Sequence, residues 1–222
     1  MDSNILGQIA LAYSPLIDRN RSVSATRLSI FPLQPGAALD SGSLLEAISE
    51  VWPVGGPAVA LNVLSESLLQ DILARQPATH MMIEIPAFMA SDPENTKLIT
   101  DLHANGNTML LKGRPVRELP REVLPCFKHS IIDLSDDRRI DPSSVAPHGV
   151  MRTISHVQSG VRTVADMEAC FRRGAVAVLG WPIHDAIEGA TRAADQPGLQ
   201  VIVQLIDQVH KEEDIEKLEN TL

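Results

Sequence analysis

Short apolar runs recur along the chain, and each is entered from a polar or Gly/Pro-rich turn. The first two flank Asp18-Arg19-Asn20-Arg21, which predicts a hairpin between two strands. The later runs are short and rich in Val, Ile, Leu and Met, which is typical of strands buried on both faces. The predicted strands are Ile9–Leu16, Val23–Phe31, Ala58–Val63, His80–Ile85, Thr108–Leu111, Ser130–Leu134, Val150–Ile154 and Ala175–Leu179.

Helix-like segments lie between most of these runs. Ser65–Arg75 places its leucines and an isoleucine on one face. Pro93–Asn105 follows a candidate N-cap, Asp92, and stops before Gly106. Thr163–Arg173 ends in two arginines followed by a glycine, a common helix stop. Strands that alternate with helices predict a parallel sheet with helical crossovers.

The number of strands favours a closed barrel. Eight strands within roughly 180 residues fit a (β/α)8 barrel better than an open doubly wound sheet. Because the chain opens with a hairpin, the first strand is expected to run antiparallel to its neighbours. We assign the barrel to residues 1–196.

The pattern changes after Pro197. Four apolar residues repeat at helical spacing: Ile202, Leu205, Ile206 and Val209. A charged turn, His210–Asp214, precedes a second amphipathic stretch that stops with the chain. We therefore predict a helical extension over 197–222. The apolar stripe is expected to pack on the barrel, on a region that follows in a longer protein, or on a second copy.

Composition narrows the classes of function. The net charge of −9 argues against non-specific binding to nucleic acid or to an anionic membrane, although one small anion could still be held by a local arginine. The aromatic content of 3% argues against base-stacking surfaces. No apolar run has the roughly 20 residues of a membrane span, and no signal peptide is recognisable, so we expect a cytoplasmic protein. Cys126 and Cys170 have no metal-binding spacing and are expected to be reduced core thiols.

Several strand ends carry a recognisable succession of motifs. These are Ser14-Pro15-Leu16-Ile17-Asp18-Arg19-Asn20, Asn62 within Ala60–Val63, Glu84 between two isoleucines, Asp133, and Gln158–Thr163 followed by Leu179-Gly180. Their order and spacing resemble EAL domains, the cyclic-di-GMP phosphodiesterases of bacterial signalling, of the type in which an HDOD region follows. The resemblance extends from Ala10 to about Ala186 and implies a (β/α)8 barrel. Glu213–Leu218 is similar to the start of an HDOD region.

The resemblance also shows what is missing. Active members hold divalent ions with carboxylates, and by this mapping the first-strand Glu is Arg27 and the Asp-Asp pair is Lys112-Gly113. A later Glu is Ser159, and a Lys that acts as base is Ile131. The surviving matches are Asn62, Glu84 and Asp133. Arg27 and Lys112 in the same barrel mouth should repel Mg²⁺. We therefore expect a pseudo-enzyme with no catalytic residue, no bound metal and no cofactor.

Two interpretations of the barrel mouth remain open. In the first, the surviving Asn62, Glu84 and Asp133 pair with Arg27 and Lys112 in a salt-bridged plug. In the second, Arg27, Lys112, Ser159 and Arg162 form a pocket for an anion or nucleotide. The matching functions are a signalling scaffold that acts through protein contact and a receptor that binds cyclic-di-GMP or a relative without cleaving it. An enzyme with repurposed chemistry would need a base and ligands that the sequence does not offer.

Overall fold

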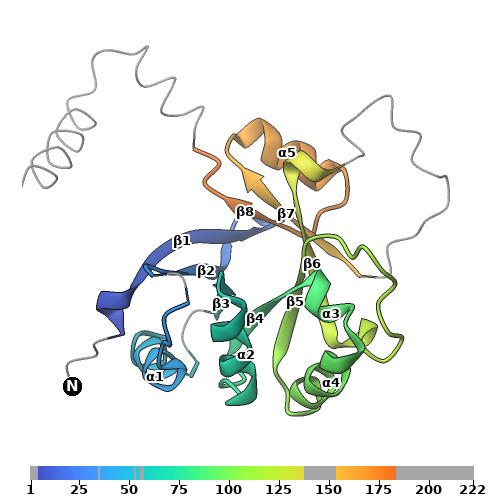
Figure 1. Ribbon diagram of the computed structural model, residues 1–222. Coiled ribbons are helices and arrows are strands. Elements are labelled where there is room, and N and C mark those ends of the chain that lie inside the picture. Colours follow the sequence, from blue (N-terminus) through green and yellow to red (C-terminus); the bar gives the residue numbers. More distant parts are fainter. Residues whose placement is uncertain (1–4, 35, 53, 56–57, 138–153, 184–222) are drawn as a thin grey trace, which may run out of the picture.

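The computed structural model describes residues 5–34, 36–52, 54–55, 58–137 and 154–183. Within them the chain forms a closed barrel of eight strands in sequential order (Figure 1). β1 is antiparallel to both β2 and β8, and the other neighbouring strands are parallel. The (β/α)8-type fold with an antiparallel first strand is thus confirmed. The strands are β1 Ile9–Asp18, β2 Val23–Pro32, β3 Ala58–Val63, β4 Met81–Pro86, β5 Thr108–Lys112, β6 Phe127–Asp133, β7 His156–Val161 and β8 Ala177–Gly180.

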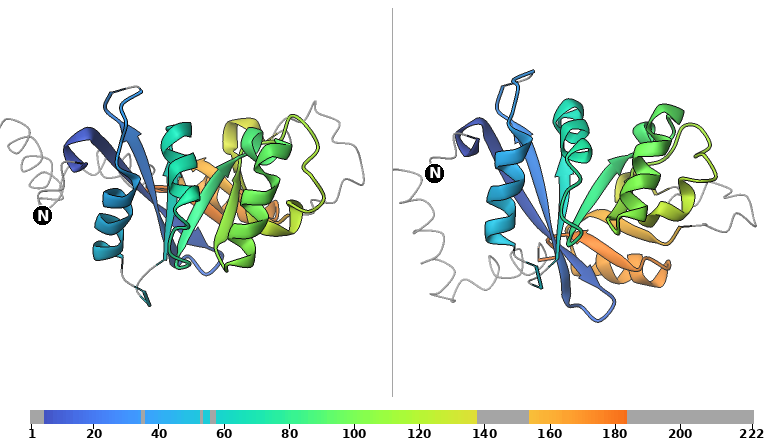
Figure 2. Two further views of the ribbon diagram at one scale, coloured as in Figure 1. Left: turned by 60° about the horizontal axis from the view of Figure 1, so that its bottom comes forward. Right: turned by 90° about the horizontal axis from the view of Figure 1, so that it is seen from below.

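Helices stand around the strands, and viewed from below α1, α2 and α4 lie outside the barrel (Figure 2). The caps follow the usual chemistry: the side chains of Asp40, Ser65 and Thr163 accept backbone N–H bonds at the starts of α1, α2 and α5. The α-helices are α1 Ser41–Val51, α2 Glu66–Ala74, α3 Ala87–Ala90, α4 Thr96–Ala104 and α5 Val164–Arg172. Short 3₁₀ helices are η1 Leu6–Gln8, η2 Pro93–Asn95, η3 Leu124–Cys126 and η4 Leu134–Asp136.

Two sequence predictions need comment. Helix α1 was not predicted, although Asp40 caps it and Leu44 and Ile48 lie one turn apart on its buried face. The predicted strand Val150–Ile154 falls almost wholly outside the described residues, and the described strand β7 begins later, at His156. The predicted extension over 197–222 also lies outside the described residues, so the domain boundary stays a prediction.

The barrel interior repeats one pattern on six strands. An apolar inward residue is followed two positions later by a polar one, and because successive side chains alternate faces, both point inward. The apolar members pack with Leu16, Ala177 and Leu179 in one cluster inside the barrel. The pairs are Ala25/Arg27, Ala60/Asn62, Met82/Glu84, Leu110/Lys112, Ile131/Asp133 and Val157/Ser159. The interior is therefore apolar in the layer nearer the amino ends of the parallel strands. It is polar at the mouth, which the carboxyl ends of these strands form.

Two contacts involve β8 and the residues that lead into it. Gly180 has φ +146°, and a Cβ atom there would lie 2.0 Å from the carbonyl oxygen of Val161, so only glycine fits this approach of β7 and β8. The hairpin tip between β1 and β2 is held from outside, because Arg19 Nε donates to the carbonyl oxygen of Ala175 at 2.9 Å. Among the described residues, no helix is long and apolar enough to cross a membrane.

Candidate functional site

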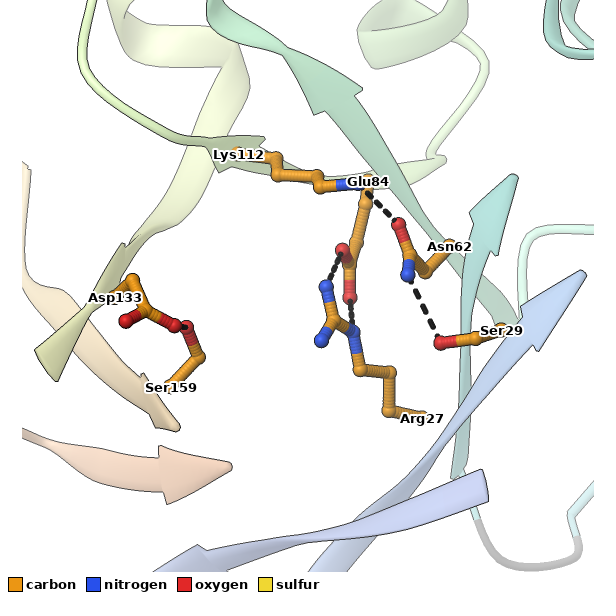
Figure 3. A network of polar contacts seen from close by, with 7 residues as sticks. All are labelled: Arg27, Ser29, Asn62, Glu84, Lys112, Asp133 and Ser159. Atoms are coloured by element: carbon orange, nitrogen blue, oxygen red, sulfur yellow. Dashed lines mark hydrogen bonds and ion pairs between the residues drawn. The ribbon is translucent and has the colours of Figure 1, made fainter. Parts of the chain in front are cut away.

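The candidate site is the layer of polar side chains at the barrel mouth (Figure 3). Its central contact joins β2 to β4. Arg27 Nε donates to Glu84 Oε1 at 2.7 Å, and Arg27 Nη2 donates to Oε2 at 2.6 Å. This bidentate geometry is the strong form of an arginine–carboxylate pair. The Arg27 side chain is 17% exposed and that of Glu84 is fully buried, so the pair is largely shielded from solvent.

A second chain of contacts runs beside this pair. Lys112 Nζ donates to Asn62 Oδ1 at 2.6 Å, and Asn62 Nδ2 donates to Ser29 Oγ at 2.9 Å. Three strands, β5, β3 and β2, are thereby joined through side chains (Figure 3). Ser29 was not predicted as a site residue. The sequence does indicate its position, because Ser29 lies two residues after Arg27 and both side chains are therefore on the inner face of β2.

Burial sets the protonation behaviour of the charged residues. Burial raises the pKa of Glu84, an effect that the hydrogen bonds and charge of Arg27 oppose. Burial likewise lowers the pKa of Lys112, while the charge of Glu84 acts to raise it and that of Arg27 to lower it further. Arg27, Lys112 and Glu84 thus share a poorly solvated space. Contacts that compensate their charges are therefore favourable there.

Asp133 behaves differently from the plug expected from the sequence. It accepts from Ser135 N at 3.0 Å and Ser135 Oγ at 2.7 Å through Oδ1, and from Ser159 Oγ at 3.2 Å through Oδ2. Figure 3 shows it across the mouth from Arg27, with Ser159 as its neighbour. Burial acts to raise the pKa of Asp133, but the hydrogen bonds from Ser135 and Ser159, together with the charge of Arg27, outweigh it and hold the pKa below its usual range. The expectation that Asp133 pairs with Arg27 or Lys112 was therefore wrong.

The hydrogen bonds leave little for a metal ion to bind. All five side-chain oxygens of Asn62, Glu84 and Asp133 accept a hydrogen bond from another side chain or from the backbone. Within the described part of the chain, no three His, Cys, Asp or Glu side chains come together as a metal-binding group. Hard divalent cations require several free oxygen ligands, and the residues at the mouth do not fit that requirement.

The remaining predicted site residues do not join this cluster. Arg162 follows β7 and is exposed, and the structure records no contact between it and Arg27, Lys112 or Ser159. The predicted interaction stripe, Ile202, Leu205, Ile206 and Val209, lies outside the described residues. The predicted four-residue pocket is therefore represented at the mouth by three residues, of which Ser159 faces Asp133.

A second candidate site lies on the outer side of the barrel. The connection from β5 to β6 holds only the short η3, because Gly113, Pro115, Pro120 and Pro125 interrupt helix formation. No helix among the described residues covers these strands here, and they border a groove of about 760 Å³. Its floor includes Leu111, Leu124, Ile132 and Ile154, and its rim includes Arg114, Arg117 and Arg121. Val116, also at its edge, is 97% exposed.

Solved structures of similar fold are EAL-domain proteins. The PaMucR phosphodiesterase in complex with c-di-GMP is 17% identical, with a TM-score of 0.55 over 82% of this chain and 92% of that one. The EAL-like domain protein YdiV is 12% identical, with a TM-score of 0.53 over 78% and 91% of the two chains. The apo S helix-GGDEF-EAL portion of LapD from Vibrio cholerae is 12% identical, with a TM-score of 0.53; the match covers 83% of this chain and 55% of that one.

At these identities the likeness concerns the fold, and it shows that the chain has the barrel of EAL domains. The match covers only 55% of the LapD portion, whose description also names an S helix and a GGDEF region. No family model matches the sequence, and no curated protein is similar to it.

Proposed function

We propose that this barrel is a catalytically inactive, EAL-like signalling domain of a cytoplasmic bacterial protein, and that it acts through contact with another protein. The observation that carries the first half is the bidentate pair of Arg27 and Glu84. A positive guanidinium holds both oxygens of the most buried carboxylate at the mouth, and Lys112 holds the amide oxygen of Asn62. Metal-assisted cleavage of a phosphodiester needs those oxygens for divalent ions.

The fold neighbours are compatible with this proposal, since they include a phosphodiesterase and a protein described only as EAL-like. Fold by itself does not decide between such functions, because function depends on the site that a barrel carries. In this chain the site offers two cations and three oxygen-bearing residues that are already engaged. This supports loss of the metal chemistry rather than its modification.

The groove between β5, β6 and the 113–126 connection supports protein contact. It combines an apolar floor with three arginines and one glutamate, Glu118, in a chain whose net charge is −9. Phe88 and Val116 are exposed beside it, and Val116 and Arg117 also line an adjoining hollow of about 360 Å³. Exposed apolar side chains rimmed by charge are typical of protein-binding surfaces. The partner that fits is a protein segment with apolar and acidic side chains; a following HDOD region and a second copy are the candidates within reach.

The test uses a matched pair of variants. Val116→Glu places a negative charge beside the groove, and Val54→Glu places the same charge on a residue that is 82% exposed elsewhere on the barrel. Affinity capture in the absence of nucleotide should recover a partner with wild type and Val54→Glu, and lose it with Val116→Glu. Equal capture by all three proteins would exclude the groove. Size-exclusion chromatography with light scattering of the same variants distinguishes self-association from capture of another protein.

A non-hydrolysing nucleotide receptor is the second candidate. The observation in its favour is that Arg27 and Lys112, both partly exposed, face the same mouth at the end of the barrel where ligands of such folds bind. Binding of c-di-GMP that needs no metal and is abolished by Arg27→Glu would favour this receptor over the scaffold.

A further inference from the structure

The outer face of β1 is apolar and exposed where its neighbour is covered. Leu11 pairs with Ile30 of β2, and Tyr13 pairs with Leu28. The β2 residues are buried beneath α1, with 0% and 5% exposure, whereas Leu11 and Tyr13 are 48% and 66% exposed. Figure 1 shows α1 beside β2 and α5 beside β7 and β8, with no described helix over the middle of β1. Paired side chains are thus buried on β2 and exposed on β1.

The bare surface continues onto the residues that follow β8. Trp181 packs edge-on against Tyr13 with 5.6 Å between ring centroids, and its Nε1 donates to the carbonyl oxygen of Tyr13 at 3.3 Å. Trp181 and Ile183 are both about half exposed. No charged residue occurs in β1 before Asp18, so an ionic partner finds little to bind on this strand. Other apolar side chains would therefore bury this surface favourably.

We propose that the C-terminal segment of the same chain covers this surface, with the stripe Ile202, Leu205, Ile206 and Val209 packed on Leu11, Tyr13 and Trp181. The stripe has the i, i+3, i+4, i+7 spacing of one apolar helix face. The described chain ends at Ile183, next to Trp181, so the segment begins at the edge of the surface that it covers. The nineteen residue steps from Ile183 to Ile202 (202 − 183) can reach any point along the strand, since an extended residue spans about 3.3 Å.

Tethering favours this occupant over a second copy. A short flexible linker gives a segment an effective concentration near the surface on the order of millimolar, which a separate molecule reaches only at very high concentration. The inference goes beyond the proposed function, because the groove near Val116 and the β1 surface involve different strands. It assigns a role to residues of the extension that the scaffold proposal leaves unused.

The test follows the exposure of Trp181 in the full chain. The protein has two tryptophans, so incorporation of fluorotryptophan gives two fluorine NMR resonances, which a Trp181→Phe variant assigns. The solvent-isotope shift of each resonance reports its contact with water, and Trp52 serves as an internal reference. Leu205→Asp disrupts the stripe, whereas Gln204→Asp introduces the same charge on the opposite face of the helix that the spacing predicts. Circular dichroism confirms that both variants fold.

We expect a small isotope shift for Trp181 in wild type and in Gln204→Asp, and a shift at least twice as large in Leu205→Asp. An isotope shift that shows Trp181 to be fully exposed in wild type would overturn the proposal. An isotope shift of Trp181 that is equal in the two variants would also overturn it. Burial of Trp181 that disappears on dilution would also overturn it, since a second copy would then be the cover. A protected Trp181 at every concentration supports the same-chain contact.

A second pair of variants tests the other side of the contact. Leu11 and Leu64 are 48% and 47% exposed, and only Leu11 lies on the surface of β1. Leu11→Glu should lower the melting temperature by about 4 °C or more, because it buries a charge beneath the segment, whereas Leu64→Glu should change it little. Equal shifts for the two glutamates would count against the cover, whatever the result with Leu205→Asp.

Discussion

Arg27 and Glu84 face each other across the barrel mouth and are joined by two hydrogen bonds of 2.7 and 2.6 Å. The contact ties β2 to β4, strands separated by β3, and one partner has no exposed side-chain surface. A buried carboxylate in this position depends on its arginine, because burial alone disfavours the charge. The consequences for stability and for ligand binding follow from that dependence.

Removal of the arginine should be costly. Arg27→Met leaves the Glu84 carboxylate buried without its partner and should lower the free energy of unfolding by about 3–5 kcal/mol. Replacing both residues, Arg27→Met with Glu84→Leu, should recover most of that loss. Urea unfolding of the four proteins in a double-mutant cycle measures the coupling. The control is Arg21→Met, which breaks a more exposed pair with Glu168 and should cost under about 1 kcal/mol. Equal costs for the two arginines would contradict the buried-pair account.

The pH dependence should carry a contribution from Asp133. Its folded pKa is lowered, so its charged form stabilises the fold. That stability is present above the unfolded pKa of about 3.9 and is lost as pH falls through the folded value. Asp133→Asn should therefore be less stable than wild type near neutral pH, with the difference shrinking below about pH 4. The effect is small because the residue is exposed. Urea unfolding across this range, with Asp136→Asn as a control for charge loss, measures it; a constant difference would oppose the prediction.

Divalent ions should leave stability unchanged. A ligand that binds only the folded state raises the melting temperature by mass action. Because every side-chain oxygen of Asn62, Glu84 and Asp133 already accepts a hydrogen bond, Mg²⁺ or Mn²⁺ should produce no shift, and EDTA should remove none. Thermal unfolding with each additive tests this. A rise in melting temperature that saturates with Mg²⁺ would show a metal site at odds with the proposed pseudo-enzyme.

Barrel closure should be sensitive to a single methyl group. Gly180→Ala would place Cβ 2.0 Å from a backbone oxygen of Val161, which forces β7 and β8 apart. We expect a loss of at least about 4 kcal/mol in the free energy of unfolding, in the range of severe substitutions. Gly174→Ala is the control, since Gly174 also has positive φ but open space around it. It should cost about 1–3 kcal/mol, the strain of the backbone alone. A Gly180→Ala protein as stable as the control would refute the close approach.

The fold could be predicted from the sequence because its signals are local. The apolar runs gave Ala58–Val63 with its observed bounds, and the polar 18–21 turn gave the hairpin and hence the antiparallel β1. Helix α1 was overlooked although it has a cap and an amphipathic face, because its glycine and serines at the start resemble a loop. Near β7, the alternation of small, apolar and polar residues did not distinguish Val150–Ile154 from the strand that begins at His156.

The partners at the mouth could be predicted only in part. Opposite charges at strand ends predicted that Asn62, Glu84 and Asp133 as a group would pair with Arg27 and Lys112, and within that group Arg27 does pair with Glu84. Strand register and the distance across the barrel determine that Lys112 contacts Asn62 and that Asp133 contacts two serines. Sequence spacing does not fix these quantities. Ser29 was missed for the same reason, since its role appears only when Asn62 lies beside it.

The most direct test of the central claim is to mix the purified chain with c-di-GMP and Mg²⁺, follow binding by calorimetry, and analyse the mixture for a linear cleavage product. The account predicts no heat of binding up to high ligand concentration and no product, since Arg27 and Lys112 engage Glu84 and Asn62 at the mouth. Appearance of the linear product would contradict the pseudo-enzyme, and micromolar binding without product would replace the scaffold with a nucleotide receptor.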